Sequence, residues 1–263
     1  CIGLGGKHGF LGVVAANLSM RGQTLEYMNE LSAALADCRN AAELARKIRR
    51  PRAEMIAGIV AAYIADTNDP IEGETWAKAS LQIARRLGAR LFESINLEYL
   101  GRFAAQTGNR SEGENLIQKA LEILRESESG MRFLGGRSCG ALALVTQDER
   151  DRLSALAEGK ALLRSGAPAH NHLWFNRDAM EVCLQMGRWA DVETYAKALE
   201  DYTSAEPLPW SDYYIARGRA LAAFGAGRRE EVTLLELRRL RDEGERIGLR
   251  HALPALERAL ASS

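Results

Sequence analysis

The sequence predicts an all-α protein, and three observations support that fold class. Only six prolines occur in 263 residues, and alanine, leucine, arginine and glutamate, all strong helix formers, dominate the chain. Apolar residues recur at helical spacing, as in the stripe formed by Leu116, Ile117, Ala120, Leu121 and Leu124. No stretch alternates apolar and polar residues for long enough to indicate a strand.

Turn-forming residues divide the chain at short intervals. The earliest clear break is Asp66-Thr67-Asn68-Asp69-Pro70. We expect further breaks at residues 107–109, 147–148, 165–168, 186–188 and 225–227. The helices between these breaks would be of ordinary length, roughly 12 to 18 residues.

One segment, residues 97–123, has a specific pattern of small residues. Leu100 precedes Gly101, Ala104 follows three residues later, Gly108 ends the expected helix, and Ala120 lies on the next one. Gly101 and Ala104 would let a neighbouring helix approach closely, and Gly108 would permit a tight turn. In these positions the segment resembles a tetratricopeptide repeat.

Weaker copies of this unit flank the segment. The residues at the close-packing position recur at intervals of 43, 39, 40 and 38 residues, and they are Gly58, Gly101, Gly140, Met180 and Gly218. These intervals exceed the period of about 34 of a standard tetratricopeptide repeat, so we expect lengthened helices or linkers. A HEAT-type array is the alternative, but it would not explain the pattern of small residues.

The predicted fold is therefore a tetratricopeptide-like α-solenoid, a right-handed superhelical array of antiparallel helix pairs. We expect a single domain over residues 1–263 with about six helix pairs. It would comprise a divergent N-terminal repeat at 1–50, repeats at 51–247 and a C-terminal cap at 248–263, whose last helix is Leu253–Leu260. Stacking is needed because one helix pair cannot bury both of its faces alone.

The composition limits the classes of partner. Basic and acidic residues balance at 35 each, which argues against nucleic-acid or membrane binding through bulk charge. No apolar run approaches the roughly 18 residues of a membrane span. The four cysteines lie far apart and form no metal-binding or disulfide pattern, so a reducing cytoplasm is the expected location.

Candidate chemical motifs are weak, and we expect no catalytic, cofactor or metal site. Residues 3–8 superficially resemble a phosphate-binding loop, but His8 stands where a hydroxyl residue is required, so we expect a flexible entry to the first helix. His170 and His172 have no further ligand to complete a metal site, and a capped turn is the simpler interpretation. Cys139 and Cys183 lie among apolar residues, which predicts buried, inert thiols.

The first helix of each pair would line the concave side of the array, where a protein partner could bind. The long polar residues expected on this inner face are Glu98, Arg102, Gln106, Arg137, Arg177, Glu181, Gln185 and Arg219. We hypothesise that Arg137, Arg177 and Arg219 contact an acidic ligand or a preceding domain. The alternative is that these side chains only solvate the groove.

Four segments suggest a narrower family resemblance. They are Gly130–Phe133, His170–Phe175, Ala205–Asp212 and Gly248–Glu257. Together they resemble the C-terminal helical-repeat region of bacterial proteins that carry a class III adenylate or guanylate cyclase domain followed by a STAND-type ATPase module. The resemblance covers most of the chain and is best from about residue 51. It implies a regulatory or interaction segment downstream of those modules, neither of which the chain contains.

These observations predict a non-catalytic scaffold whose partner is a peptide segment or the upstream domains of the same polypeptide. The alternative is a small-molecule sensor that regulates an attached ATPase or cyclase. An aromatic cluster would suit a sensor pocket or plain packing equally well, and it consists of Trp174, Phe175, Trp189, Trp210, Tyr213 and Tyr214. The sequence does not indicate the oligomeric state.

Overall fold

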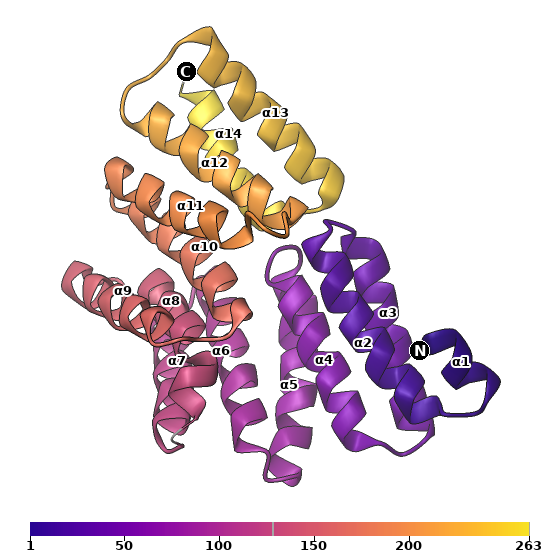
Figure 1. The fold of residues 1–263 in the computed structure, drawn as a ribbon. Coiled ribbons are helices and arrows are strands. Elements are labelled where there is room, and N and C mark those ends of the chain that lie inside the picture. The colour runs from indigo at the N-terminus through magenta and orange to yellow at the C-terminus, as the bar shows by residue number, and fades with distance from the viewer. Residues whose placement is uncertain (128, 263) are drawn as a thin grey trace.

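The chain folds into consecutive packed helices, and the computed structural model describes residues 1–127 and 129–262 (Figure 1). The α-helices are α1 (Ile2–Lys7), α2 (Leu11–Tyr27), α3 (Leu31–Lys47), α4 (Pro51–Ala65), α5 (Pro70–Arg86), α6 (Arg90–Gln106), α7 (Arg110–Arg125), α8 (Gly136–Val145), α9 (Glu149–Arg164), α10 (Ala169–Gln185), α11 (Trp189–Thr203), α12 (Pro209–Gly225), α13 (Glu231–Ile247) and α14 (Leu253–Ala261). A π-helical turn, η1 (Met131–Gly135), leads into α8, and a 3₁₀ turn, η2 (Arg250–Ala252), precedes α14. These described residues contain no strand, which confirms the predicted all-α class.

Each predicted break separates two consecutive helices, for identifiable chemical reasons. At the break after α4, the Asp69 side chain accepts hydrogen bonds from the backbone N–H groups of Ile71 and Glu72, and Pro70 occupies the first turn of α5. At the break after α6, Gly108 has a φ of +100°, a conformation that favours glycine. The predicted terminal helix is also confirmed, because α14 begins at Leu253.

The expected flexible entry at residues 3–8 is wrong, because residues 3–7 lie in α1 and His8 caps its C-terminal end. The backbone N–H of Gly5 donates to the Cys1 carbonyl oxygen at 2.8 Å, and that of His8 donates to Leu4 at 3.0 Å. Gly5 is buried against α2, where an added Cβ would lie 2.9 Å from Cγ2 of Val14. Packing against α2 therefore holds a short helix that its glycine content disfavours.

Each helix packs against the next one in the chain. In addition, each even-numbered helix from α2 to α12 contacts the next even-numbered helix. The even-numbered helices therefore form the inner layer, and the odd-numbered helices from α3 to α13 lie outside it (Figure 1). The repeated position that the sequence singled out places Gly58, Gly101, Gly140, Met180 and Gly218 on α4, α6, α8, α10 and α12 respectively. The internal repeat thus corresponds to the inner layer.

Close approach between α6 and α7 depends on two glycines. A Cβ added to Gly101 would lie 2.6 Å from the Gly113 carbonyl oxygen, and one added to Gly113 would lie 2.5 Å from the Gly101 carbonyl oxygen. The two backbones therefore touch directly. This confirms the predicted role of Gly101, with α7 as the neighbouring helix.

The array curves until its two ends meet. Helix α12 contacts α2, and the ring of Trp210 meets that of Tyr27 edge-on at a centroid distance of 5.9 Å. The backbone N–H of His251 in η2 donates to the Thr67 carbonyl oxygen, between α4 and α5, at 3.1 Å. In Figure 1 the C-terminal helices approach the upper ends of α2 and α3. The inner layer consequently encloses a core rather than an open groove.

No helix in the described part of the chain is long and apolar enough to cross a membrane.

Candidate functional site

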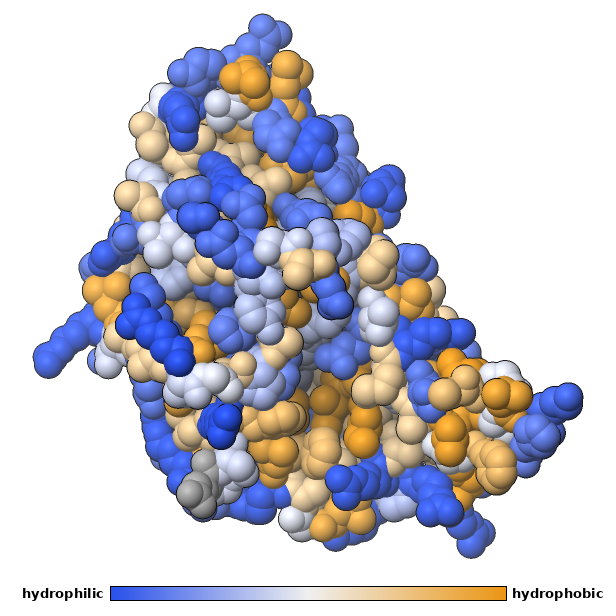
Figure 2. Space-filling model, viewed as in Figure 1, coloured by the Kyte–Doolittle hydropathy of each residue, from blue (hydrophilic) through white to orange (hydrophobic). Residues whose placement is uncertain are grey.

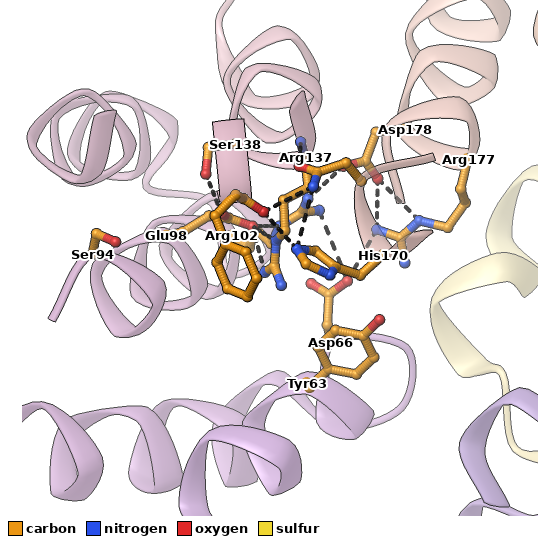
Figure 3. Close-up of polar contacts among 12 residues, drawn as sticks. Tyr63, Asp66, Ser94, Glu98, Arg102, Arg137, Ser138, His170, Arg177 and Asp178 are labelled. Carbon is orange, nitrogen blue, oxygen red and sulfur yellow. Dashed lines mark hydrogen bonds and ion pairs between the residues drawn. The ribbon is translucent and has the colours of Figure 1, made fainter. Parts of the chain in front are cut away.

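The enclosed core contains a network of buried charges, shown in Figure 3. Glu98 on α6 is its first centre, and its side chain is buried. Its Oε1 accepts from Nη2 of Arg137 at 2.7 Å and from Nε of Arg102 at 3.3 Å. Its Oε2 accepts from the Ser138 hydroxyl at 2.5 Å. Helices α6 and α8 are therefore joined by charge-assisted hydrogen bonds out of contact with water.

A second centre joins the end of α4 to α10. Nη2 of Arg177 lies 3.1 Å from Oδ2 of Asp66 and 2.6 Å from Oδ1 of Asp178. Arg102 donates a short hydrogen bond to Asp178 and so connects this centre to Glu98. The Gln106 amide nitrogen donates to Oδ1 of Asp66 at 2.9 Å. Three arginines thus balance three carboxylates within one buried network.

Aromatic rings complete the surroundings of these arginines. The Arg177 guanidinium lies 4.1 Å from the Trp174 ring centroid and 5.7 Å from that of Tyr214. The Arg137 guanidinium lies 5.0 Å from the Tyr99 ring centroid. Each of these arginines stacks on an aromatic face and also pairs with a carboxylate. Because both contacts are directional, the guanidinium groups are held in fixed positions.

The arginines of the network lower the pKa values of two of its carboxylates, Asp66 and Glu98. Burial alone would raise the pKa of Asp66, but the charges of Arg177 and Arg102 outweigh it and hold that pKa below its ordinary value. In the same way, burial would raise the pKa of Glu98, but the charges of Arg137 and Arg102 outweigh this effect and lower it. These groups are therefore structural counter-ions of the arginines.

Glu26, which the sequence analysis did not single out, behaves differently. This residue near the end of α2 is fully buried, and neither carboxyl oxygen has a hydrogen-bond partner among the described residues. Burial raises the pKa of Glu26 well above its ordinary value, and Arg177 only partly opposes that effect. Burial therefore favours the protonated form of this carboxyl group, which lies near Arg177 and Asp66 of the network.

A pocket of about 250 Å³ opens beside the network. It is lined by the corner between α4 and α5, by the C-terminal ends of α6, α8 and α10, by α12, and by η2 with α14. Arg102, Arg177 and Asp66 form its inner wall, whereas Arg110 and Arg258 lie nearer its rim. The pocket thus depends on residues from both halves of the chain.

The structure divides the eight predicted groove residues into three groups. Glu98, Arg102, Arg137 and Arg177 are buried in the network, and of these four Arg102 and Arg177 also reach the pocket wall. Gln106, Glu181 and Gln185 line the pocket. Arg219 lies apart on α12, where it pairs with Glu193 and Glu200 of α11 at 2.8 Å each. Arg137, Arg177 and Arg219 therefore do not form one surface, although the binding of a partner stays a prediction.

The aromatic cluster also separates. Trp174, Trp210 and Tyr214 form a continuous buried set, with ring centroids 5.5 Å and 4.8 Å apart along the series. Phe175 instead packs on Tyr195, at 6.0 Å. Most of these rings thus pack between helices, and only Tyr214 reaches the pocket wall.

The histidines and cysteines considered for metal binding or catalysis make packing and hydrogen-bonding contacts instead. The imidazole Nε2 of His170 lies 2.7 Å from the Phe133 carbonyl oxygen, and His172 stacks on Tyr202 with ring centroids 4.2 Å apart. Cys139 and Cys183 are buried as expected, and burial raises their thiol pKa to about 12 and about 11. Within the described ranges, no group of three or more His, Cys, Asp or Glu side chains is arranged to hold a metal ion.

Fold and site together define an all-helical array whose ends close around a buried charge network and a small pocket. The chain matches no known family profile and no curated protein sequence.

Proposed function

We propose that this chain is a non-catalytic, tetratricopeptide-like module that binds a protein partner. In this proposal the helices form antiparallel pairs in a right-handed superhelix, as the sequence pattern predicts. The partner is an upstream cyclase or ATPase module of the same bacterial signalling polypeptide, which the family resemblance implies. The chain would act as a cytoplasmic regulatory segment.

An exposed apolar face at the N-terminal end of the array carries the proposal. The side chains of Leu4, Phe10 and Val13 on and between α1 and α2 are 67%, 63% and 49% exposed, and Met20 and Leu11 extend the same region. Figure 2 shows apolar residues gathered over α1 and α2. An exposed apolar face of this kind is typical of an interaction surface.

The inner layer offers less for such a partner. Four of the eight long polar residues expected there are already paired and buried in this closed form. Of these four, Arg102 and Arg177 line the small pocket, whereas Glu98 and Arg137 do not. The outer N-terminal face is exposed, and a module that precedes the array in the chain would lie next to it.

Photo-crosslinking in the producing cell tests this proposal. A photoreactive phenylalanine analogue at Phe10 is expected to crosslink to a cyclase or STAND-type ATPase domain, whether it is in the same or another polypeptide. The matched control places the analogue at Ile71 on α5, an isolated apolar residue that is 71% exposed. Equal crosslinking at the two positions, or the lack of such a domain among the products at Phe10, would contradict the proposal.

The pocket favours a second candidate function, a small-molecule sensor. Because its walls come from both halves of the array, a bound molecule would contact α6, α12 and α14 together. Such a ligand would stabilise the closed form by mass action. A thermal-shift screen with anionic, neutral and cationic metabolites tests this candidate. If the chain is a sensor, at least one compound should raise the unfolding temperature. A screen in which no compound does so would contradict this candidate.

A further inference from the structure

The rim of the pocket carries positive charge that the protein does not neutralise. Arg110, at the start of α7, donates to the backbone carbonyl oxygens of Leu144 and Val145 at 2.8 Å and 3.1 Å. Arg258 on α14 is exposed. Neither guanidinium has a carboxylate within ion-pair distance among residues 1–127 and 129–262. Both arginines also line an adjoining surface hollow.

A third arginine increases this local charge. Arg152 on α9 lines the same hollow, and its guanidinium donates to the Thr146 carbonyl oxygen at 2.6 Å. Glu149 is the one carboxylate that lines the hollow. Three arginines therefore face a single acid, in a protein whose total charges balance.

The acids of the pocket itself do not neutralise the rim. Asp66 is engaged by Arg177, and Glu181 by Arg217 through a short hydrogen bond. Arg217 also donates to the Ala252 carbonyl oxygen at 2.9 Å, which ties α12 to η2. Both carboxylates of the pocket thus have arginine partners of their own, and the rim arginines are left over.

The inner wall provides an additional donor. Arg102 is buried, and its Nη1 has no hydrogen-bond partner in the described part of the chain, although it lies 3.9 Å from Oδ2 of Asp66. The Gln106 Oε1 atom, on another residue that lines the pocket, likewise has no partner there. Buried polar groups are nearly always hydrogen-bonded in native proteins. The inner end of the pocket is therefore polar, in keeping with its charged rim.

We propose that this pocket binds a small organic anion through its carboxylate or phosphate group, with Arg110 and Arg258 as the principal cationic contacts. Guanidinium groups match the geometry of both oxyanions through paired hydrogen bonds. The volume of about 250 Å³ exceeds that of cavities that hold benzene, about 150 Å³. It is below the usual range of drug-sized ligands, roughly 300 to 1,000 Å³. The ligand is therefore the size of a small metabolite.

This inference deepens the sensor candidate and rests on it, but it does not depend on the partner-binding face. Inorganic phosphate and citrate serve as probes, each compared with chloride at equal ionic strength. We expect at least one of them to raise the unfolding temperature above the chloride reference and to show saturable binding by calorimetry. Phosphate alone would assign a phosphate ligand, and citrate alone a carboxylate ligand.

The decisive variant is Arg258→Gln, because this side chain is exposed and its replacement is expected to leave the fold intact. Loss of one charge-assisted contact is expected to weaken binding of the active probe about tenfold or more. The control Arg86→Gln removes an equally exposed charge on α5 and should bind as the unmodified protein does. The proposal is overturned if neither anion binds, or if Arg258→Gln binds as tightly as the control. Stabilisation by neutral or cationic compounds alone would retain the sensor and reject the anion site.

Discussion

Arg177 on α10 and Asp66 at the end of α4 are 111 residues apart in sequence, yet they pair through Nη2 and Oδ2 at 3.1 Å. Both side chains are buried. The pair can form only because the inner layer curves until helices from the two halves of the chain face each other. It therefore reports directly on the closure of the array.

We predict that Asp66→Asn lowers the free energy of unfolding by about 3–5 kcal/mol, since it leaves Arg177 with an incomplete set of counter-charges. The measurement is urea unfolding followed by circular dichroism. The double variant Asp66→Asn/Arg177→Met should lose less than the sum of the two single variants. Strict additivity would contradict the coupling. The control Arg219→Gln removes the partly exposed ion pairs with Glu193 and Glu200 and should cost no more than about 1 kcal/mol.

Glu26 should give the stability an opposite dependence on pH from that of Asp66. The pKa of Glu26 is raised in the folded state, mainly by burial. Its contribution to the free energy of unfolding is therefore complete below the pKa of the unfolded state, near 4.5, and is lost as the pH rises toward the pKa of the folded state. Glu26→Gln removes this titration. Its stability relative to the unmodified protein should therefore increase with pH, by up to about 1.4 kcal/mol for each pH unit.

Urea unfolding from about pH 5 to about pH 8 measures this effect. The matched control is Glu30→Gln, which alters an exposed carboxylate four residues further along the chain. A difference between Glu26→Gln and the unmodified protein that does not change with pH would show that the buried carboxyl does not titrate as described.

Gly101→Ala should destabilise the protein although alanine is the better helix former. Its Cβ would lie 2.6 Å from the Gly113 carbonyl oxygen, so α6 and α7 must move apart. We expect a loss of about 1–3 kcal/mol in the free energy of unfolding. In contrast, an added Cβ at Gly12 on α2 meets no atom within 4 Å, and Gly12→Ala should be neutral or slightly stabilising. Equal effects of the two substitutions would disprove the close approach.

The local features of the fold could be predicted because they depend on neighbouring residues. Helical periodicity, the Asp69-Pro70 start of α5 and the turn at Gly108 each act within one or two turns, and Gly101 acts between two consecutive helices. Their spacing also located the inner layer. The error at residues 3–8 arose because packing on α2 outweighs the low helix propensity of glycine. The capped turn expected at His170 and His172 is also wrong, because both residues lie within α10.

The charge network could not be predicted from the sequence, because its pairs depend on the curvature of the whole array. The sequence indicates only that Asp66 belongs to a turn, and Asp178 and Glu26 are part of no recognisable motif. The inner-face positions of Glu98 and Arg177 were identified, but their burial follows from the meeting of α2 with α12. A small change in the angle between successive helix pairs would expose them, and no local pattern specifies that angle.

Hydrogen exchange at the His251 amide tests the closure of the array most directly, since this N–H donates to Thr67 across the junction of the two ends. We predict strong protection in the unmodified protein. Trp210→Ala, which removes a buried ring packed against Tyr27, should lower that protection at least tenfold while amides within α6 change less. Exchange of the His251 amide at the rate of an unstructured peptide in the unmodified protein would contradict a closed array.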